Sequence, residues 1–309
     1  SGWYNTAKPH KTLGFDITFT LNTTFVPDAH KTFNPQALDL QGIDAQSASS
    51  PTAMGENDPG VTLNYTENIN GQDYTLASFD LPKGTGIGFA PAPMLQVGLG
   101  LFKGTEVIGR YIPDMQLGNQ AEIGLWGVGL KHSLKQWIPA VNKLPILHIS
   151  LMGGYTKLNS QTGLSFMPED YVEAGLVNQS NIWDYTSYYN NQRISMDISS
   201  FTGNLLVSAN LPVVCFYGGV GFNNVKTNLA LNGNYPLPAF NPDNTEMEIT
   251  KESSKTDPIN MEIKHQSGNR TRPRYNVGMR FKFAVITLHF DYTYSDYSVA
   301  TAGLGISFR

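Results

Sequence analysis

Apolar and polar residues alternate with a period of two through the last part of the chain, residues 274–309. This alternation places one set of side chains on each face of a β-sheet. Three consecutive segments show it, at 275–283, 286–294 and 300–308, and the set opposite the apolar one is small or charged. A transmembrane β-barrel with an apolar outside and a polar lumen would produce this pattern. A soluble sheet that buries one face would also alternate.

The same alternation recurs in seven segments upstream. They are residues 13–25, 94–102, 107–112, 122–130, 147–155, 194–211 and 214–231. A membrane-crossing strand needs about 9–11 residues, and the segment 13–25 is long enough. Together the segments make an even count of ten, or twelve if a hairpin at 61–65 and 74–79, closed at Asn70-Gly71, also crosses.

Two of these segments do not keep one apolar face throughout. In 122–130, Ile123 and Leu125 have the opposite parity to Trp126, so the facing of this strand is ambiguous. In 194–211 the apolar positions change parity near Ser199 and Ser200. A β-bulge, which inserts one extra residue, would restore a single apolar face, and we expect one there.

The connections between the segments are sorted by length. The short links, at 103–104, 131–143, 212 and 284–285, all fall at one end of the strands, and the segment 134–141 has the spacing of a short amphipathic helix. The long ones, at 27–93, 157–191 and 232–272, all fall at the other end. Short periplasmic turns, long extracellular loops and an even strand count are typical of bacterial outer-membrane barrels. A soluble sandwich has no reason to sort its loops in this way.

The sequence therefore predicts an all-β fold. We expect an antiparallel transmembrane β-barrel of about 10–14 strands, with long extracellular loops and short periplasmic turns. Residues 13–309 would form this single barrel domain in the outer membrane. Residues 1–12 would form an N-terminal periplasmic segment or the end of a plug. Ser1-Gly2-Trp3 does not look like a natural start, so we expect that residues upstream have been cleaved.

Composition narrows the class of protein further. Charged residues make up 15% of the 309 residues, well below the roughly 25% of a soluble domain. No apolar run approaches the roughly 18 residues of a membrane helix, which excludes a helical membrane protein. The net charge of -4 gives no sign of nucleic-acid binding. The single cysteine, Cys215, excludes an internal disulfide, and we expect a small buried residue there.

Several stretches carry a resemblance to a known family. They are GWYNTAKPHK at 2–11, GFD at 14–16, GVGLKHSLKQWIP at 127–139 and GYTKL at 154–158. Through them the chain resembles an uncharacterised family of outer-membrane β-barrel proteins of Bacteroidota, over most of its length apart from the long loops. The resemblance implies the bacterial outer membrane as location and brings no mechanism with it. A looser similarity is to long-chain fatty-acid transporter-type barrels, which carry an N-terminal plug and are wider than ten strands.

Charged side chains on the polar face would point into the lumen of such a barrel. By parity, the lumen-lining charges are Asp16, Arg110, Asp197, Arg280, Lys282, His289 and Asp291. They could line a narrow aqueous or ligand path. They could also form salt bridges that fill the lumen, because a barrel of about ten strands has little interior beyond its own side chains. Both interpretations stay open.

Aromatic residues mark where the strands would meet the two membrane surfaces. The candidates for these girdles are Trp126, Trp137, Tyr155, Tyr292 and Tyr294. Tyrosine and tryptophan concentrate at such interfaces because one end of the ring is apolar and the other is polar. We expect these side chains to be anchors rather than ligand contacts.

No motif predicts catalysis or a cofactor. His148 and Ser150 lie two apart on one strand face, which is a minimal base and nucleophile, but no acid is assigned to orient the histidine. The acidic residues Asp243, Glu246 and Glu248 lack the spacing of a calcium loop. We therefore expect a non-enzymatic protein with no metal and no cofactor.

Three functions fit this sequence. The first is a narrow channel or transport barrel for small or hydrophobic molecules. The second is an accessory or scaffold subunit of a larger outer-membrane complex for nutrient uptake, secretion or barrel assembly. The third is a soluble β-sandwich that binds carbohydrate through Trp183, Tyr185 and Tyr188. For a barrel, the expected partners are membrane lipid and lipopolysaccharide, with other outer-membrane proteins possible and nucleic acid excluded.

Overall fold

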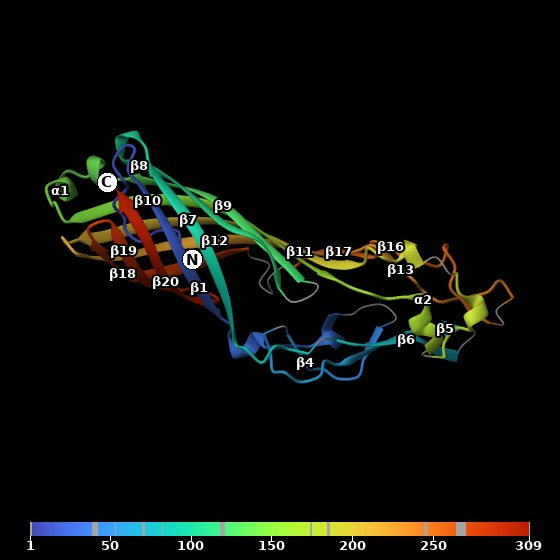
Figure 1. Ribbon diagram of the computed structural model, residues 1–309. Coiled ribbons are helices and arrows are strands. Elements are labelled where there is room, and N and C mark those ends of the chain that lie inside the picture. The colour runs from blue at the N-terminus through green and yellow to red at the C-terminus, as the bar shows by residue number, and fades with distance from the viewer. Residues whose placement is uncertain are drawn as a thin grey trace.

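The computed structural model describes residues 2–38, 43–52, 54–69, 72–81, 83–117, 121–173, 175–183, 186–243, 246–263 and 270–308. Ten antiparallel strands close into a barrel (Figure 1). They are β1 (Phe15–Phe25), β7 (Phe89–Gly100), β8 (Thr105–Leu117), β9 (Ala121–Ser133), β10 (Leu147–Gly163), β11 (Arg193–Asn210), β12 (Val214–Asn232), β18 (Thr271–Phe283), β19 (Ile286–Tyr294) and β20 (Ser298–Phe308).

Pairing between the first and last strands closes the ring. Strand β1 pairs with β20 along its whole length, from Phe15 opposite Phe308 to Phe25 opposite Ser298, and with β7 on its other side. Strands β11 and β12 complete the circuit. The predicted antiparallel barrel is thus confirmed, with ten strands, and the sandwich alternative is wrong because the strands form one closed ring. The hairpin of β5 (Thr62–Ile69) and β6 (Gln72–Asp80) pairs with β3 (Ile43–Ala45) in a separate sheet, and Asn70-Gly71 lies outside the described residues.

Large apolar side chains cover the outside of the barrel in a continuous outward belt. Members of this belt include Phe15, Ile17, Phe19, Leu95, Val97, Leu99, Val128, Leu130, Leu151, Leu205, Val207, Phe216, Val220, Val277, Phe290, Leu304 and Ile306, all exposed. The residues between them point inward and are largely buried, as the repeated exposed-buried pattern of β1, β7 and β20 shows. Apolar outside and polar inside is the reverse of a soluble fold, and it is the arrangement of a membrane barrel.

The connections are sorted between two ends. At the turn end, β7 leads to β8 through η3 (Phe102–Gly104), β9 to β10 through η4 (Lys135–Trp137) and α1 (Pro139–Asn142), and β18 to β19 through residues 284–285. Lys103 and Ala284 take left-handed backbone conformations, with φ of 54° and 53°, that reverse the chain tightly. The expected amphipathic helix is replaced by the two one-turn helices η4 and α1, separated by Ile138, which is extended because it precedes Pro139.

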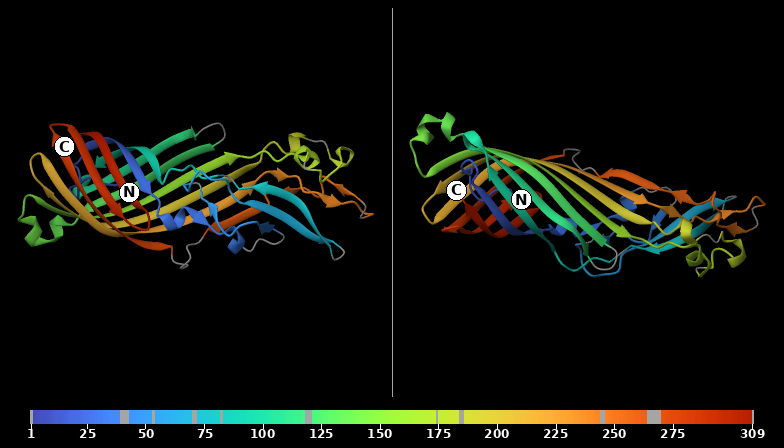
Figure 2. Two further views of the ribbon diagram at one scale, coloured as in Figure 1. Left: turned by 90° about the horizontal axis from the view of Figure 1, so that it is seen from below. Right: turned by 45° about the horizontal axis from the view of Figure 1, so that its top comes forward.

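The long connections leave the opposite, loop end in two arms, and the molecule is elongated (Figures 1 and 2). One arm holds η1 (Asp28–His30), β2 (Thr32–Phe33), η2 (Pro35–Leu38), β4 (Ser50–Pro51) and the sheet of β3, β5 and β6. The other holds α2 (Pro168–Glu173), η5 (Gln179–Asn181), η6 (Thr186–Tyr188), β13 (Asn234–Tyr235), β14 (Ala239–Phe240), β15 (Met247–Glu248), β16 (Lys255–Thr256) and β17 (Ile259–Ile263). Among the described residues, no helix is both long and apolar enough to cross a membrane.

Strands β8 to β12 continue past the belt on one side of the barrel and form a wall, here called the extension (Figure 2). The pairing of β11 with both neighbours runs without a register shift through Ser199 and Ser200. The expected β-bulge there is therefore wrong. Because the alternation is unbroken, Ile198 in the extension points to the same inner side as Leu206 in the barrel, while Leu205 points outward. The apolar residues thus change face where the strand leaves the belt.

The same change of face explains the ambiguous strand β9. Trp126 points outward with the belt, so Leu125 and Ile123 point inward, on the side of the buried Ile112 of β8. Above Trp126 the outward face is no longer apolar, and Glu122 lies on it. One strand therefore carries two opposite amphipathic patterns that meet at the edge of the belt.

Candidate functional site

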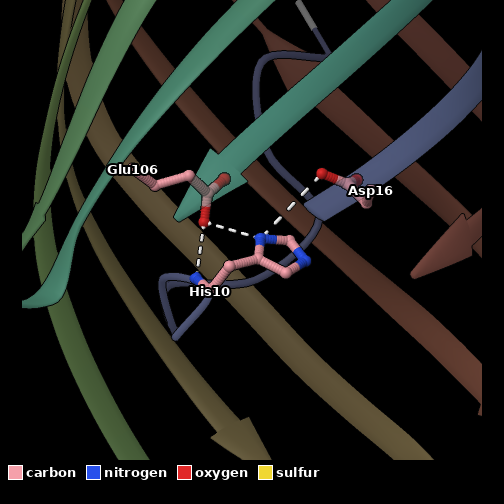
Figure 3. Close-up of side chains that lie close together, drawn as sticks. All are labelled: His10, Asp16 and Glu106. Atoms are coloured by element: carbon pink, nitrogen blue, oxygen red, sulfur yellow. Dashed lines mark hydrogen bonds and ion pairs between the residues drawn. The ribbon is translucent and has the colours of Figure 1, made fainter. Parts of the chain in front are cut away.

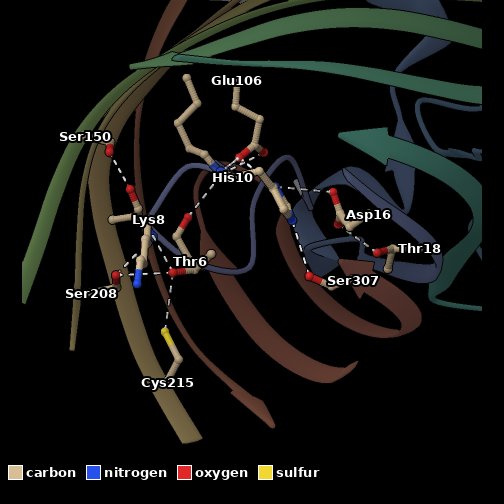
Figure 4. A network of polar contacts seen from close by, with 12 residues as sticks. Thr6, Lys8, His10, Asp16, Thr18, Glu106, Ser150, Ser208, Cys215 and Ser307 are labelled. Atoms are coloured by element: carbon tan, nitrogen blue, oxygen red, sulfur yellow. Dashed lines mark hydrogen bonds and ion pairs between the residues drawn. The ribbon is translucent and has the colours of Figure 1, made fainter. Parts of the chain in front are cut away.

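The N-terminal residues 2–11, here called the plug, lie inside the barrel (Figure 4). Trp3, Tyr4, Thr6, Ala7 and His10 are all almost completely buried. The predicted segment before the barrel is therefore packed against the inner wall. It passes into β1 at residues 11–14, where Leu13 has a left-handed φ of 65°.

Trp3 occupies a recess made by glycines that pair across β9 and β10. A Cβ atom at Gly129 would lie 2.9 Å from the indole ring, and one at Gly154 would lie 2.8 Å from it. Both distances are too short for real contacts, so a side chain at either position would displace the ring. The guanidinium carbon of Arg110 lies 3.6 Å from the ring centroid, a cation–π contact. The recess thus fixes the start of the plug against the wall.

His10 anchors the other end of the plug to charged residues of the wall (Figure 3). Its backbone N–H donates to Glu106 Oε2 at 2.8 Å, and its Nδ1 lies 2.9 Å from the same oxygen. The ammonium of Lys131 lies 2.9 Å from Glu106 Oε1, and Asp16 Oδ1 lies 3.9 Å from His10 Nδ1. All four side chains are buried. The members of this buried network satisfy one another, so loss of any one of them would leave an uncompensated buried charge.

His10, Asp16 and Glu106 each offer one atom within 4.8 Å of the others, which is close enough to bind a metal ion. Glu106 already uses both oxygens, one toward Lys131 and one toward His10. A metal ion bound here would have to displace the Lys131 ammonium from Glu106. The arrangement therefore fits an ion-paired latch for the plug better than it fits a metal centre.

Neutral hydrogen bonds hold the middle of the plug (Figure 4). The Tyr4 hydroxyl donates to Asn276 Oδ1 at 2.7 Å, and its ring meets that of Tyr217 edge-on at 6.3 Å. The Ala7 N–H donates to Ser208 Oγ at 3.1 Å. Ser150 donates its hydroxyl to the carbonyl oxygen of Ala7, so this serine binds the plug.

Most charged residues predicted to line the lumen are buried on the inner side of the wall. Asp16, Arg110, Arg280, His289 and Asp291 lie there, with the half-buried Lys282. The Lys282 ammonium donates to the carbonyl oxygen of Ser307 at 3.1 Å near the turn end. These side chains and the plug together occupy the barrel interior from the turn end up to the level of Trp126 and Tyr155.

Asp197 does not line the lumen, and that prediction is wrong. Its side chain is 48% exposed and lies 3.9 Å from the Lys157 ammonium on the outward face of the extension. The prediction assumed a bulge near Ser199 that would bring Asp197 inward. Because the pairing of β11 has no register shift, the carboxylate remains on the same side as Phe201, which points outward.

Several buried polar residues of the lumen were not predicted. Glu106, Lys131 and Arg274 lie one alternation step beyond residues whose facing was clear, so extending the pattern would have found them. The plug residues follow no such period. Their position depends on contacts with strands 96 to 297 residues away in sequence, from Glu106 to Ser307.

The predicted girdle aromatics are exposed at the edges of the belt. At the loop end, the Trp126 and Tyr155 rings lie 5.8 Å apart on β9 and β10, and Tyr292 and Tyr294 lie on β19. Trp137 lies in η4 at the turn end and is also exposed. These positions are those expected of interface anchors.

The aromatic cluster considered for carbohydrate binding lies in the arm beyond the extension. The rings of Trp183 and Tyr188 meet at 5.1 Å and nearly at right angles, and Tyr189, which contacts both, is fully buried. Tyr185 lies outside the described residues. The described rings pack on one another and so contribute to the core of the arm.

Comparison with known proteins places the chain in a family. The model of a family of unknown function, DUF6588, matches residues 1–308. The chain belongs to this family. No curated protein matches its sequence. The family match spans both the plug and the barrel.

Solved structures similar to this DUF6588 chain are outer-membrane barrels. The translocator domain of the autotransporter NalP from Neisseria meningitidis is 10% identical, with a TM-score of 0.33, and the match covers 97% of this chain and 89% of that one. The protease OmpT from Escherichia coli is 9% identical, at a TM-score of 0.34 with coverage of 96% and 97%. The toluene transporter TodX from Pseudomonas putida is 8% identical, at 0.30 with coverage of 96% and 89%. Likeness at this level carries no argument about activity.

Proposed function

We propose that this protein lies in a bacterial outer membrane and takes up small hydrophobic molecules through its barrel, with the plug as gate and without catalysing a reaction. In this proposal the turn end faces the periplasm and the loop end faces outward. The supporting observation is the change of face in the extension, which turns apolar side chains toward the side from which the lumen is entered.

Apolar residues on three strands share that inner side. They are Ile194, Met196 and Ile198 of β11, Leu229 and Leu231 of β12, and Ile259, Met261 and Ile263 of β17. The three β17 residues are 37–48% exposed. Exposed apolar surface of this kind, contiguous and rimmed by polar residues, is typical of a binding site. Burying it against a ligand contributes about 25 cal/mol per Å².

The plug supports gating because it is one continuous segment that blocks the way. Trp3 and Tyr4 lie across the barrel interior, between Arg110 on one side and Tyr217 on the other. Their contacts are side-chain hydrogen bonds and ring contacts rather than a strand ladder. Withdrawal of the plug would therefore open space in the lumen without breaking the ring of strands.

A disulfide between plug and wall tests this gate. Thr6 Oγ1 lies 3.6 Å from the Sγ of Cys215, the natural cysteine of β12. A Thr6→Cys variant would need only a small shift to reach the sulfur separation of about 2 Å in a disulfide. We expect uptake of an apolar fluorescent dye into vesicles holding the oxidised variant to fall to that of empty vesicles, and reductant to restore it.

Two control variants distinguish a plug that is locked by the disulfide from a protein that is damaged by the substitution. Thr6→Ser keeps the hydroxyl and should transport like the wild-type protein. Thr6→Cys with Cys215→Ala cannot form the disulfide and should be insensitive to reductant. If the wild-type protein and a Trp3→Ala variant with a loosened plug both move no more dye than empty vesicles, transport is the wrong function.

The filled lumen favours a second candidate, an accessory subunit of a larger outer-membrane complex. A barrel that stays closed would act through its arms, which extend far from the belt (Figure 1). Strand β17 pairs with β12 on one side, so its other edge could receive a strand from a partner. Stoichiometric co-purification of other outer-membrane proteins in mild detergent would support this role, and a lone barrel would oppose it.

A further inference from the structure

A hollow of about 500 Å³ lies on the outward face of the extension, away from the lumen and the plug. We propose that it binds the phosphorylated sugar headgroup of a glycolipid of the outer leaflet. The inference rests on the membrane placement proposed above and concerns a different surface from the transport path. It assigns a site to the lipid partner that the sequence predicts only in general terms.

The position of the hollow is the first argument. Trp126 and Tyr155 line the loop-end edge of the belt, Lys157 pairs with Trp126 across β10 and β9, and Asn159 and Gln161 occupy the next two outward positions of β10. Two residues of a strand span about 7 Å, so Lys157, two residues past Tyr155, lies at the level of the lipid headgroups if the belt lies in lipid, and Asn159 and Gln161 extend further outward. A lipid with its acyl chains along the belt would bring its headgroup to this level.

The chemistry of the lining is the second argument. Lys157 and Arg193 both line the hollow and are the cations that would bind phosphate. Asn159 and Gln161 line it with amides, and Asp114, Glu122 and Asp197 with carboxylates, groups that bind sugar hydroxyls. Below them the ring of Trp126 offers an apolar floor. Cations, amides and carboxylates side by side match a ligand that is both an anion and a polyol.

The same lining argues against a bare phosphate or a simple phospholipid. Asp197 lies 3.9 Å from the Lys157 ammonium, and Glu122 accepts a hydrogen bond from Gln161. These carboxylates would repel a lone anion, whereas hydroxyl groups of a sugar can donate to them. The volume also exceeds what a single phosphate group would fill and falls in the range of ligand pockets, about 300–1,000 Å³.

The test uses the whole protein, expressed in a Gram-negative host and purified from its outer membrane in mild detergent. Native mass spectrometry would detect retained glycolipid, and titration with purified lipid A and with phosphatidylglycerol would give affinities. The test variant is Lys157→Gln with Arg193→Gln. The matched control is Lys226→Gln, another outward lysine of the extension, on β12 and outside the hollow.

We expect the wild-type protein and Lys226→Gln to retain glycolipid and to bind lipid A more tightly than phosphatidylglycerol. The double variant should bind lipid A about tenfold or more weakly, because two charge-assisted contacts are lost. Equal retention by all three proteins, or equal affinity of the wild type for the two lipids, would overturn the proposal. Heat-dependent migration in gel electrophoresis would verify that each variant is folded.

The outcome also separates this inference from the proposed function. A protein absent from the outer-membrane fraction would remove both. A protein found there, folded and active in dye uptake but without retained glycolipid, would remove the headgroup site alone. Bound glycolipid with no dye uptake would leave the site in place and remove transport.

Discussion

The belt and the extension are built from the same strands, yet they place their apolar residues on opposite sides. On β11, Leu205 and Val207 point outward in the belt, whereas Ile194 and Ile198 point inward in the extension. The pairing shows no register shift between the two regions. A change of apolar parity can therefore mark the edge of the membrane-facing zone rather than a bulge. The medium outside the wall differs between the membrane-facing zone and the extension, and the apolar residues change face where the medium changes.

The largest expected difference between the two regions is the stability cost of breaking an ion pair, which should be high for a buried pair in the lumen and low for a half-exposed pair in the extension. We expect Glu106→Leu to lower the free energy of unfolding by about 3–5 kcal/mol, because it leaves the buried Lys131 ammonium without its partner. Asp197→Asn removes the corresponding partner of Lys157 in the extension and should cost about 0–1 kcal/mol, since that pair is half exposed. Urea titration of the protein folded into vesicles would measure both.

The double variant Glu106→Leu with Lys131→Met provides the control, because an apolar pair removes the stranded charge. It should recover most of the stability lost in Glu106→Leu. Equal costs for Glu106→Leu and Asp197→Asn would contradict the difference between lumen and extension.

A new charge on the outward face should distinguish the belt from the extension. Leu205→Arg places a charge in the belt and should cost about 2–4 kcal/mol in vesicles. Asp197→Arg, on the same strand and the same face but in the extension, should cost only about 1 kcal/mol or less, because the pair with Lys157 that it removes is half exposed. Refolding yield and urea midpoint in vesicles would report the difference. Similar effects at both positions would place the edge of the belt elsewhere.

Substitutions on the inner face of the extension should have a smaller effect, which is measured as the affinity for an apolar dye. Met196→Ser together with Leu229→Ser, which face each other across β11 and β12, should reduce the affinity for an apolar dye severalfold, because apolar contact area is lost. The matched change Ser195→Ala on the outward face should leave dye affinity unchanged. Fluorescence titration in detergent would measure both, and an unchanged affinity in the serine variant would count against a binding role for this face.

The smallest expected effect is a pH dependence in the arm beyond the extension. Burial raises the pKa of Tyr171 from 10.0 to about 12, and its hydroxyl donates to the Pro236 carbonyl at 3.0 Å. Because the folded pKa is the higher one, the stability from this group is present below pH 10 and is lost as the pH rises through 12. Tyrosinate absorbance should show one late-titrating group fewer in Tyr171→Phe than in the wild-type protein.

Alternation together with the sorting of short and long connections was enough to predict the barrel, because a strand in lipid must show one apolar face and a closed ring satisfies every backbone hydrogen bond. It also placed Asp16, Arg110 and Arg280 on the inner side, where the structure buries them. It failed at Asp197, where one face was assumed to stay apolar along the whole strand. The outward face must be apolar only where the belt faces lipid, and Asp197 lies in the extension, beyond the belt.

The sequence by itself determined the strands, their facing within the belt and the sorting of short turns from long connections, since each of these depends on neighbours one or two residues away. Only the tertiary structure decided that residues 2–11 enter the lumen, that Trp3 meets Gly129 and Gly154, and that Glu106 joins Lys131 to His10. These contacts join segments up to about 150 residues apart, and no local period encodes them. They form because closing the ring brings distant strands around a space that the plug can fill.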